Sequence, residues 1–127
     1  MASTFASTNV SRYLDAGTYK GGTAVKAGAS SNSVQNVAAT TDRPAGVLVR
    51  DPDVGYDGSV DTIAVCIAGP ATGLAGAAVE VDDDVVITAT GTLVPKSAAG
   101  WVVGKAMSKA ANGEYFELLV NIRKEPA

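Results

Sequence analysis

Histidine is absent from the sequence. It is the usual general base near neutral pH, a common metal ligand, and the partner that activates serine or cysteine nucleophiles. Its absence removes most hydrolytic mechanisms. We therefore expect a protein that is not an enzyme and that binds no cofactor and no metal.

Cysteine is nearly absent too. The single cysteine, Cys66, excludes an internal disulfide and lies in a stretch that predicts a β-strand. A free thiol in a strand usually behaves as a small buried hydrophobe, whereas a reactive thiol needs a nearby cation that lowers its pKa. No cation is adjacent to Cys66 in the sequence, so we expect a buried thiol and assembly in a cytosolic compartment.

Long apolar stretches and clustered basic residues are also missing. The N-terminus, Met1 to Phe5, has no cationic start and no apolar core, so it is not typical of a secretory signal. The longest apolar run, Ile63 to Ala71, is well short of the roughly 20 residues that span a bilayer. The net charge is −3, and residues 41–100 carry three basic and nine acidic side chains. Because nucleic-acid binding depends on clustered cations, we expect neither a nucleic-acid nor a membrane partner.

Aromatic residues make up only 6% of the chain, whereas alanine, valine and glycine abound. The core should therefore consist of small aliphatic side chains. A chain of 127 residues fits one domain of a size that can bury an independent core.

A β-hairpin is the clearest element that the sequence predicts. Asn112-Gly113 separates two apolar segments, residues 101–108 and 114–122, and such a turn favours positive φ at both central residues. Alternate residues of the second segment are apolar and should face a core: Phe116, Leu118, Val120 and Ile122. Leu119 is the one exception to this alternation.

Other short segments show strand-like patterns bounded by glycine, proline, aspartate or asparagine. The predicted strands are residues 10–14, 23–26, 34–38, 46–50, 60–68, 79–81, 85–88 and 92–94. Gly69-Pro70 should end the fifth of these, and residues 123–127 should form a charged tail. No segment of a dozen residues has helical periodicity with good caps. We predict an all-β fold, a small β-sandwich or barrel of short strands.

Two parts of the sequence resemble each other. Residues 45–49 align with 99–103, and residues 63–67 align with 118–122, with a register change of one residue between them. The pattern predicts a repeated hairpin, and two such hairpins could pack face to face. Chance similarity between short apolar strands is the alternative.

The first 42 residues have a different composition from the rest. Sixteen of them are Ser, Thr, Asn or Gln, and their apolar residues are scattered singly. A segment so poor in hydrophobic residues cannot offset its own ordering entropy. We expect residues 1–42 to form an extended, partly flexible polar arm and residues 43–127 to form the β domain.

Acidic residues gather at two places that could hold a cation. Asp51, Asp53 and Asp57 precede Gly58, but Gly55 occupies the third ligand position and the final glutamate of an EF-hand loop is missing. Residues 82–84 are three consecutive aspartates, which usually form a polar turn. A solvated loop is the favoured interpretation at both places.

The order of these elements resembles the capsid decoration, or head cement, proteins of tailed bacteriophages. The resemblance covers roughly residues 20 to 122. It includes a glycine-led early strand at 20–25, a Gly-Val strand at 46–49, a strand followed by glycine at 65–69, and two closing segments at 100–107 and 114–122. The loop at 51–58 and the polar start at 1–9 are less typical of that family.

The resemblance implies a non-enzymatic virion protein that binds the outer surface of an icosahedral head and clamps neighbouring major capsid subunits. It also implies a homo-oligomer, often a trimer, assembled in the host cytoplasm. A polar arm could add a strand to an exposed sheet edge of the shell. Its partner-binding residues would be Phe5, Val10, Tyr13 and Leu14, which could equally cover the protein's own core. The alternative function is a tail or fibre component that binds host surface glycans.

Overall fold

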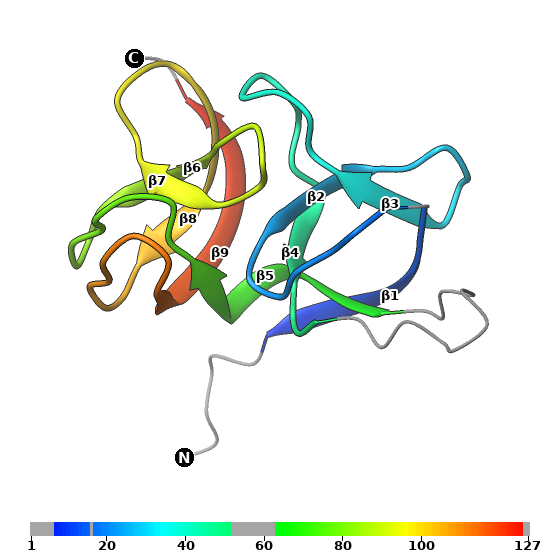
Figure 1. The fold of residues 1–127 in the computed structure, drawn as a ribbon, viewed down its shortest axis with the longest axis horizontal. Coiled ribbons are helices and arrows are strands. Elements are labelled where there is room, and N and C mark those ends of the chain that lie inside the picture. Colours follow the sequence, from blue (N-terminus) through cyan, green and yellow to red (C-terminus); the bar gives the residue numbers. More distant parts are fainter. Residues whose placement is uncertain (1–6, 16, 52–62, 126–127) are drawn as a thin grey trace.

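The computed structural model describes residues 7–15, 17–51 and 63–125 and shows nine strands in one sheet (Figure 1). Within these residues there is no helix, and so none long and apolar enough to cross a membrane. The predicted all-β class is confirmed. The strands are β1 (Thr8–Leu14), β2 (Ala24–Ala27), β3 (Ser33–Asn36), β4 (Gly46–Leu48), β5 (Ile63–Leu74), β6 (Asp84–Ile87), β7 (Leu93–Pro95), β8 (Gly100–Ala106) and β9 (Tyr115–Glu125).

The first four strands and the first half of β5 form a closed ring. β1 pairs with β3, β3 with β2, β2 with β4, and β4 with β5. Residues 8–12 of β1 pair with residues 63–68 of β5 and close the ring. We call this ring the first lobe; it lies on the right in Figure 1. In a closed ring the strands are paired with one another, so their edges are protected from pairing with another molecule.

The second half of β5 belongs to a second lobe, on the left in Figure 1. Residues 68–74 of β5 pair with β9, and the order continues through β8 and β6 to β7. A parallel bridge joins Ala75, just after β5, to Leu93 of β7. The last strand in the order of this lobe, β7, therefore lies beside the end of the first, β5. Both lobes are therefore barrel-like, and β5 runs through both.

The two lobes share a wall. Successive residues of a strand face opposite sides of the sheet. In β2, β4 and β5 both sides are buried, because the first-lobe core takes Val25, Leu48 and Val65 while the second-lobe core takes Ala24, Val47 and Cys66. Each of these side chains is at most 1% exposed. The lobes are thus parts of one packed body.

β5 is longer than predicted. It continues through Gly69 and Pro70 to Leu74, so the prediction that Gly69-Pro70 ends the strand was wrong. At Ala68 the strand is paired with both β1 and β9, whereas at residues 69–74 the described ladder partner is β9. A strand that changes neighbours can hold a proline where only one of its edges is paired.

The direction of the Pro70 nitrogen explains why it fits. The Leu74 N–H donates to the Gly22 carbonyl (2.9 Å), whereas the Ala75 N–H donates to the Glu114 carbonyl beside β9 (2.9 Å). Donors alternate between the two edges of a strand, so the Pro70 nitrogen lies on the same edge as that of Leu74. The β5–β9 ladder therefore loses no hydrogen bond at the proline.

β8 and β9 form the predicted hairpin, and its core face is confirmed. They pair antiparallel from Gly100 opposite Glu125 to Ala106 opposite Leu118. Of the four residues expected at the core, Phe116, Leu118 and Val120 are buried, and Ile122 is partly buried against the second-lobe core. β9 continues to Glu125, so the predicted charged tail from residue 123 was wrong. Instead, Arg123 forms ion pairs with Asp84 (3.3 Å) and with Glu125, and these pairs stabilise the end of the strand.

The turn of this hairpin differs from the expected one. Of the two central residues, Asn112 and Gly113, only Gly113 has positive φ (86°). The Glu114 N–H donates to the Ala111 carbonyl (3.0 Å). Positive φ at the third residue alone is typical of a type II turn. The connection is also longer than two residues, and an isolated bridge between Val79 and Ala110 holds it. That bridge is all that the structure shows of the predicted strand at 79–81.

The two similar segments of the sequence do correspond to two hairpins. β4 pairs with β5, and β8 pairs with β9, both antiparallel. The hairpins meet edge to edge through the β5–β9 ladder. They do not pack face to face, because β5 and β9 are hydrogen-bonded neighbours in the same sheet.

Three strands lie within the first 42 residues: β1, β2 and β3. Val25 and Val34 of this segment are buried in the first-lobe core. Strands on both sides of residue 42 thus belong to one sheet. The division of the chain into an arm and a domain at that residue stays a prediction about which part orders by itself.

Candidate functional site

The predicted partner-binding residues of the N-terminal segment have different surroundings. Phe5 lies outside the described residues. Leu14 is 8% exposed and belongs to the first-lobe core, and Val10 packs against the same cluster. Tyr13 is 56% exposed. Of the three that the structure describes, Tyr13 is the one that presents its side chain to solvent.

β1 is held along both edges. Residues 8–12 pair with β5, and Tyr13 and Leu14 lie opposite Ser33 and Val34 of β3. The Tyr13 N–H donates to the Asn32 carbonyl (2.9 Å). Residues 8–14 therefore form an integral strand of the first lobe.

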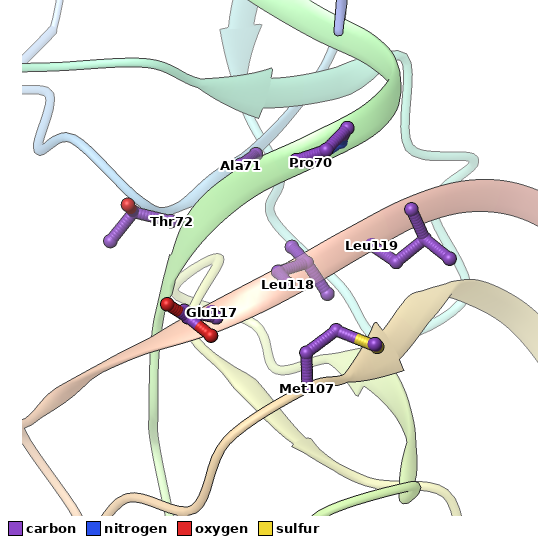
Figure 2. A pocket seen from close by; sticks show the side chains of 7 residues that line it. All are labelled: Pro70, Ala71, Thr72, Met107, Glu117, Leu118 and Leu119. Atoms are coloured by element: carbon purple, nitrogen blue, oxygen red, sulfur yellow. The ribbon is translucent and has the colours of Figure 1, made fainter. Parts of the chain in front are cut away.

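A shallow apolar groove lies over the β5–β9 ladder (Figure 2). Its volume is about 570 Å³, and its side chains come from residues 70–72 of β5, residues 117–119 of β9, and Met107 just after β8. Met107 is 49% exposed. Apolar atoms are thus gathered at one place on this face.

Leu119, the exception to the alternation in β9, lies at this groove. It is opposite Pro70 on one side and Lys105 on the other, and both of those residues are exposed. Residues directly opposite each other in an antiparallel pair share a face, so Leu119 faces outward. The sequence singled out Leu119, but it contained no signal that would place Met107 and Pro70 beside it.

A cationic cluster joins the two lobes. The Arg43 guanidinium carbon lies 5.1 Å from the centroid of the Trp101 ring, and the Lys124 Nζ lies 6.0 Å from it. Arg43 comes from the loop between β3 and β4, Trp101 from β8 and Lys124 from β9. We call these three residues the interlobe cluster. Cation–π contacts of this kind contribute about 0.5–1 kcal/mol at exposed sites.

Two cavities adjoin the interlobe cluster. One, of about 450 Å³, is lined by Trp101 and Lys124 together with Thr40 and Thr41. The other, of about 630 Å³, is lined by Arg43 with further residues that include Ile67 and Ile122. Sequence reasoning missed this site, because its three members lie far apart in the chain. The one available signal was the single tryptophan.

Cys66 is buried, as the sequence predicted. It is 0% exposed, its Sγ lies 3.3 Å from the Ala68 carbonyl oxygen, and burial raises the pKa of the thiol. A raised pKa reduces the thiolate fraction and so makes the sulfur less reactive.

The acidic residues that could hold a cation have structural roles where the structure describes them. The Asp51 carboxylate accepts a hydrogen bond from the Gly21 N–H (2.7 Å), while Asp53 and Asp57 lie outside the described residues. The Asp83 carboxylate accepts one from the Glu80 N–H (2.9 Å). In the described part of the chain, no three side chains of the metal-binding types come together.

The fold resembles that of a solved phage protein. The crystal structure of the head fiber gp8.5 N base in bacteriophage phi29 matches with a TM-score of 0.66 and 20% sequence identity. The match covers 96% of this chain and 99% of the other. At this identity the likeness concerns the fold alone. No curated protein matches the chain in sequence.

A family model covers almost the whole chain. The model of the structural cement protein family (E217 gp24/Pam3 gp6) matches residues 1–121. The match includes all the strands of the first lobe and most of β9. The resemblance to phage head cement proteins is thereby confirmed, and the chain belongs to the structural cement proteins of bacteriophages, which makes it a structural protein of the virion.

Proposed function

We propose that this protein binds the outer surface of an icosahedral phage head and stabilises the shell by clamping neighbouring major capsid subunits. The observation that carries this proposal is the cement-family match over residues 1–121. A cement acts through shape and contact, so the proposed role requires no catalysis and no cofactor.

The geometry supports a clamp. β5 passes through both lobes, and the two cores share a wall of strands that are buried on both faces. Such a wall fixes the distance between the surfaces of the two lobes, because interiors packed like this deform little. A body with two lobes at a fixed separation can contact two coat subunits at once.

We further propose that the protein acts as a homo-oligomer, with a trimer as the expected state, and that it joins the head in the host cytoplasm. A trimer on a symmetric lattice makes several identical contacts. Linked contacts increase the overall affinity by large factors even when each is weak.

The proposed partner-binding residues of the N-terminal segment are Phe5, Val10, Tyr13 and Leu14. The exposure of Tyr13 supports a direct contact with the coat. The positions of Val10 and Leu14 at the first-lobe core support an indirect role, in which they hold β1 in place.

The test is binding to expanded heads that lack this protein. We expect stoichiometric co-sedimentation and a higher temperature of head disruption. Tyr13→Ala should weaken binding, whereas Tyr115→Ala is the matched control, because Tyr115 is exposed to a similar extent (48%) on β9. Failure of the wild-type protein to bind any coat lattice would overturn the proposal.

A second candidate function is a fibre component that binds host surface glycans. The fold likeness to the phi29 head fiber base favours it, although only at the level of the fold. Two measurements separate the functions: stabilisation of the shell by the bound protein supports a cement, whereas label on the tail, or glycan-dependent binding to host cells, supports the second candidate.

A further inference from the structure

We propose that the interlobe cluster of Arg43, Trp101 and Lys124 binds an acidic segment of the major capsid protein. The inference rests on the proposed function, because it takes the coat as the partner. It goes beyond that function by assigning the contact to named side chains and by stating the chemistry of the partner.

Among the residues that the structure describes, the two cations of the cluster have no acidic partner. Elsewhere in the described structure, Lys26 pairs with Asp42 (3.1 Å), and Arg123 pairs with Asp84 and Glu125. Across residues 7–15, 17–51 and 63–125, no carboxylate forms an ion pair with Arg43 or Lys124. Both side chains are exposed. Both cations lie within 6.0 Å of the centroid of one ring, so their charges add in attracting an anion.

Trp101 holds the cations in place before a ligand arrives. Their cation–π contacts, at 5.1 Å and 6.0 Å from the ring centroid, restrict two long side chains that would otherwise be free. Ordering a flexible side chain on binding costs about 0.5–1.5 kcal/mol, so a site ordered beforehand binds more tightly. Tryptophan and arginine are also enriched among the residues that dominate protein interfaces.

The surroundings favour a peptide over a nucleic acid. The adjoining cavities offer both hydroxyl groups, from Thr40 and Thr41, and apolar side chains, from Ile67 and Ile122. The protein as a whole carries a net charge of −3. A polyanion with a charge at every nucleotide would be repelled by this charge, whereas a peptide can present one or two carboxylates to the cations.

The position of the site fits a clamp. Arg43 belongs to the first lobe and Lys124 to the second, and both contact the same ring. A coat segment bound at these cations would contact both lobes at once, as a clamp requires.

The first experiment tests the chemistry without heads. Trp101 is the only tryptophan, so 5-fluorotryptophan gives a single fluorine NMR signal from the site. We expect a six-residue peptide with two central glutamates among glycines to shift this signal, and neither the same peptide with two central lysines nor a DNA dodecamer to do so. The double variant Arg43→Glu/Lys124→Glu should abolish the shift. The matched control is Lys20→Glu/Lys109→Glu, which reverses the charge of two exposed lysines elsewhere and should preserve the shift. A stronger response to DNA, or none to the glutamate peptide, would overturn the inference.

The second experiment uses heads that lack this protein. We expect the Arg43→Glu/Lys124→Glu variant to bind at least about tenfold more weakly than the wild type and the lysine control, because both charges now repel the partner. The difference should shrink between about 0.05 M and 0.5 M salt, since salt screens exposed charges.

The outcomes separate the inference from the proposed function. If the wild-type protein binds heads and the double variant binds equally well, the inference is wrong and the cement function stands. If the wild-type protein does not bind heads, the proposed function fails and with it the assignment of the coat as partner. Circular dichroism and the unfolding midpoint of the double variant establish that it is folded.

Discussion

Leu119 of β9 lies directly opposite Pro70 of β5, and both face away from the core that the neighbouring Leu118 helps to fill. Leu118 is 1% exposed, so Leu118→Ala should lower the free energy of unfolding by about 2–5 kcal/mol. Leu119→Ala, on the outer face of the same strand, should lower it by less than about 1 kcal/mol. Urea unfolding of both variants measures the difference. Equal losses would contradict the assigned faces.

Gly104 of β8 leaves no room for a side chain against the backbone of β9. A Cβ at this position would lie 2.0 Å from the Leu119 carbonyl oxygen, so the ladder itself would have to move. We expect Gly104→Ala to reduce stability by about 1–3 kcal/mol or more. Lys105→Ala, at the adjacent exposed position, is the control and should change stability little. Thermal or urea unfolding followed by circular dichroism measures both.

The Cys66 thiol should resist modification in the folded protein. It is fully buried, and burial raises its pKa, so both access and thiolate fraction are low. We expect very slow reaction with a thiol reagent under native conditions and reaction of one thiol per chain in denaturant. Rapid labelling of the folded protein would mean that the wall between the lobes opens readily.

The Asp42 carboxylate holds the loop before β4 and should make stability depend on pH. Its pKa is lowered from 3.8 chiefly by the hydrogen bond from the Ala38 N–H, and further by Lys26 and by the Ala39 N–H. Because the folded state favours the ionised form, the stabilisation is present above pH 3.8 and is lost as pH falls through the lower pKa of the folded state.

This dependence can be measured by comparing the wild type with Asp42→Ala. The variant should be less stable at neutral pH, and the difference should shrink as pH falls below 3.8 and through the lower pKa of the folded state. Glu117→Gln, at an exposed position of β9, serves as a control for general effects of removing a carboxylate. A difference that persists in acid would assign the loss to packing rather than to charge.

The parts of the fold that could be predicted are those with a local signal. β9 has one buried and one solvated face, so its apolar residues alternate, and Phe116, Leu118 and Val120 were assigned correctly. The strand from Ala24 to Ala27 was expected from residue 23, within one residue. The sequence showed that this segment is a strand. It did not show which face of the strand meets which core, because a strand buried on both faces has no polar side to mark its orientation.

The errors also have physical causes. The sequence predicted a strand end at Gly69-Pro70, because proline cannot donate in a ladder. β5 nevertheless continues, since the proline nitrogen faces the edge that β9 does not occupy. The predicted tail from Arg123 is strand because residues 123–125 pair with residues 100–102 of β8, and Asp84 adds an ion pair to Arg123.

By itself the sequence determined the all-β class, the closing hairpin, the burial of Cys66 and the absence of histidine chemistry, because these follow from composition and from alternation within short segments. Only the tertiary structure decided that β5 serves two lobes and that Arg43 and Lys124 meet at Trp101. Alternation shows which side of a strand is buried. Alternation does not show which distant strand pairs with a given strand, and that pairing brings the residues of the interlobe cluster together.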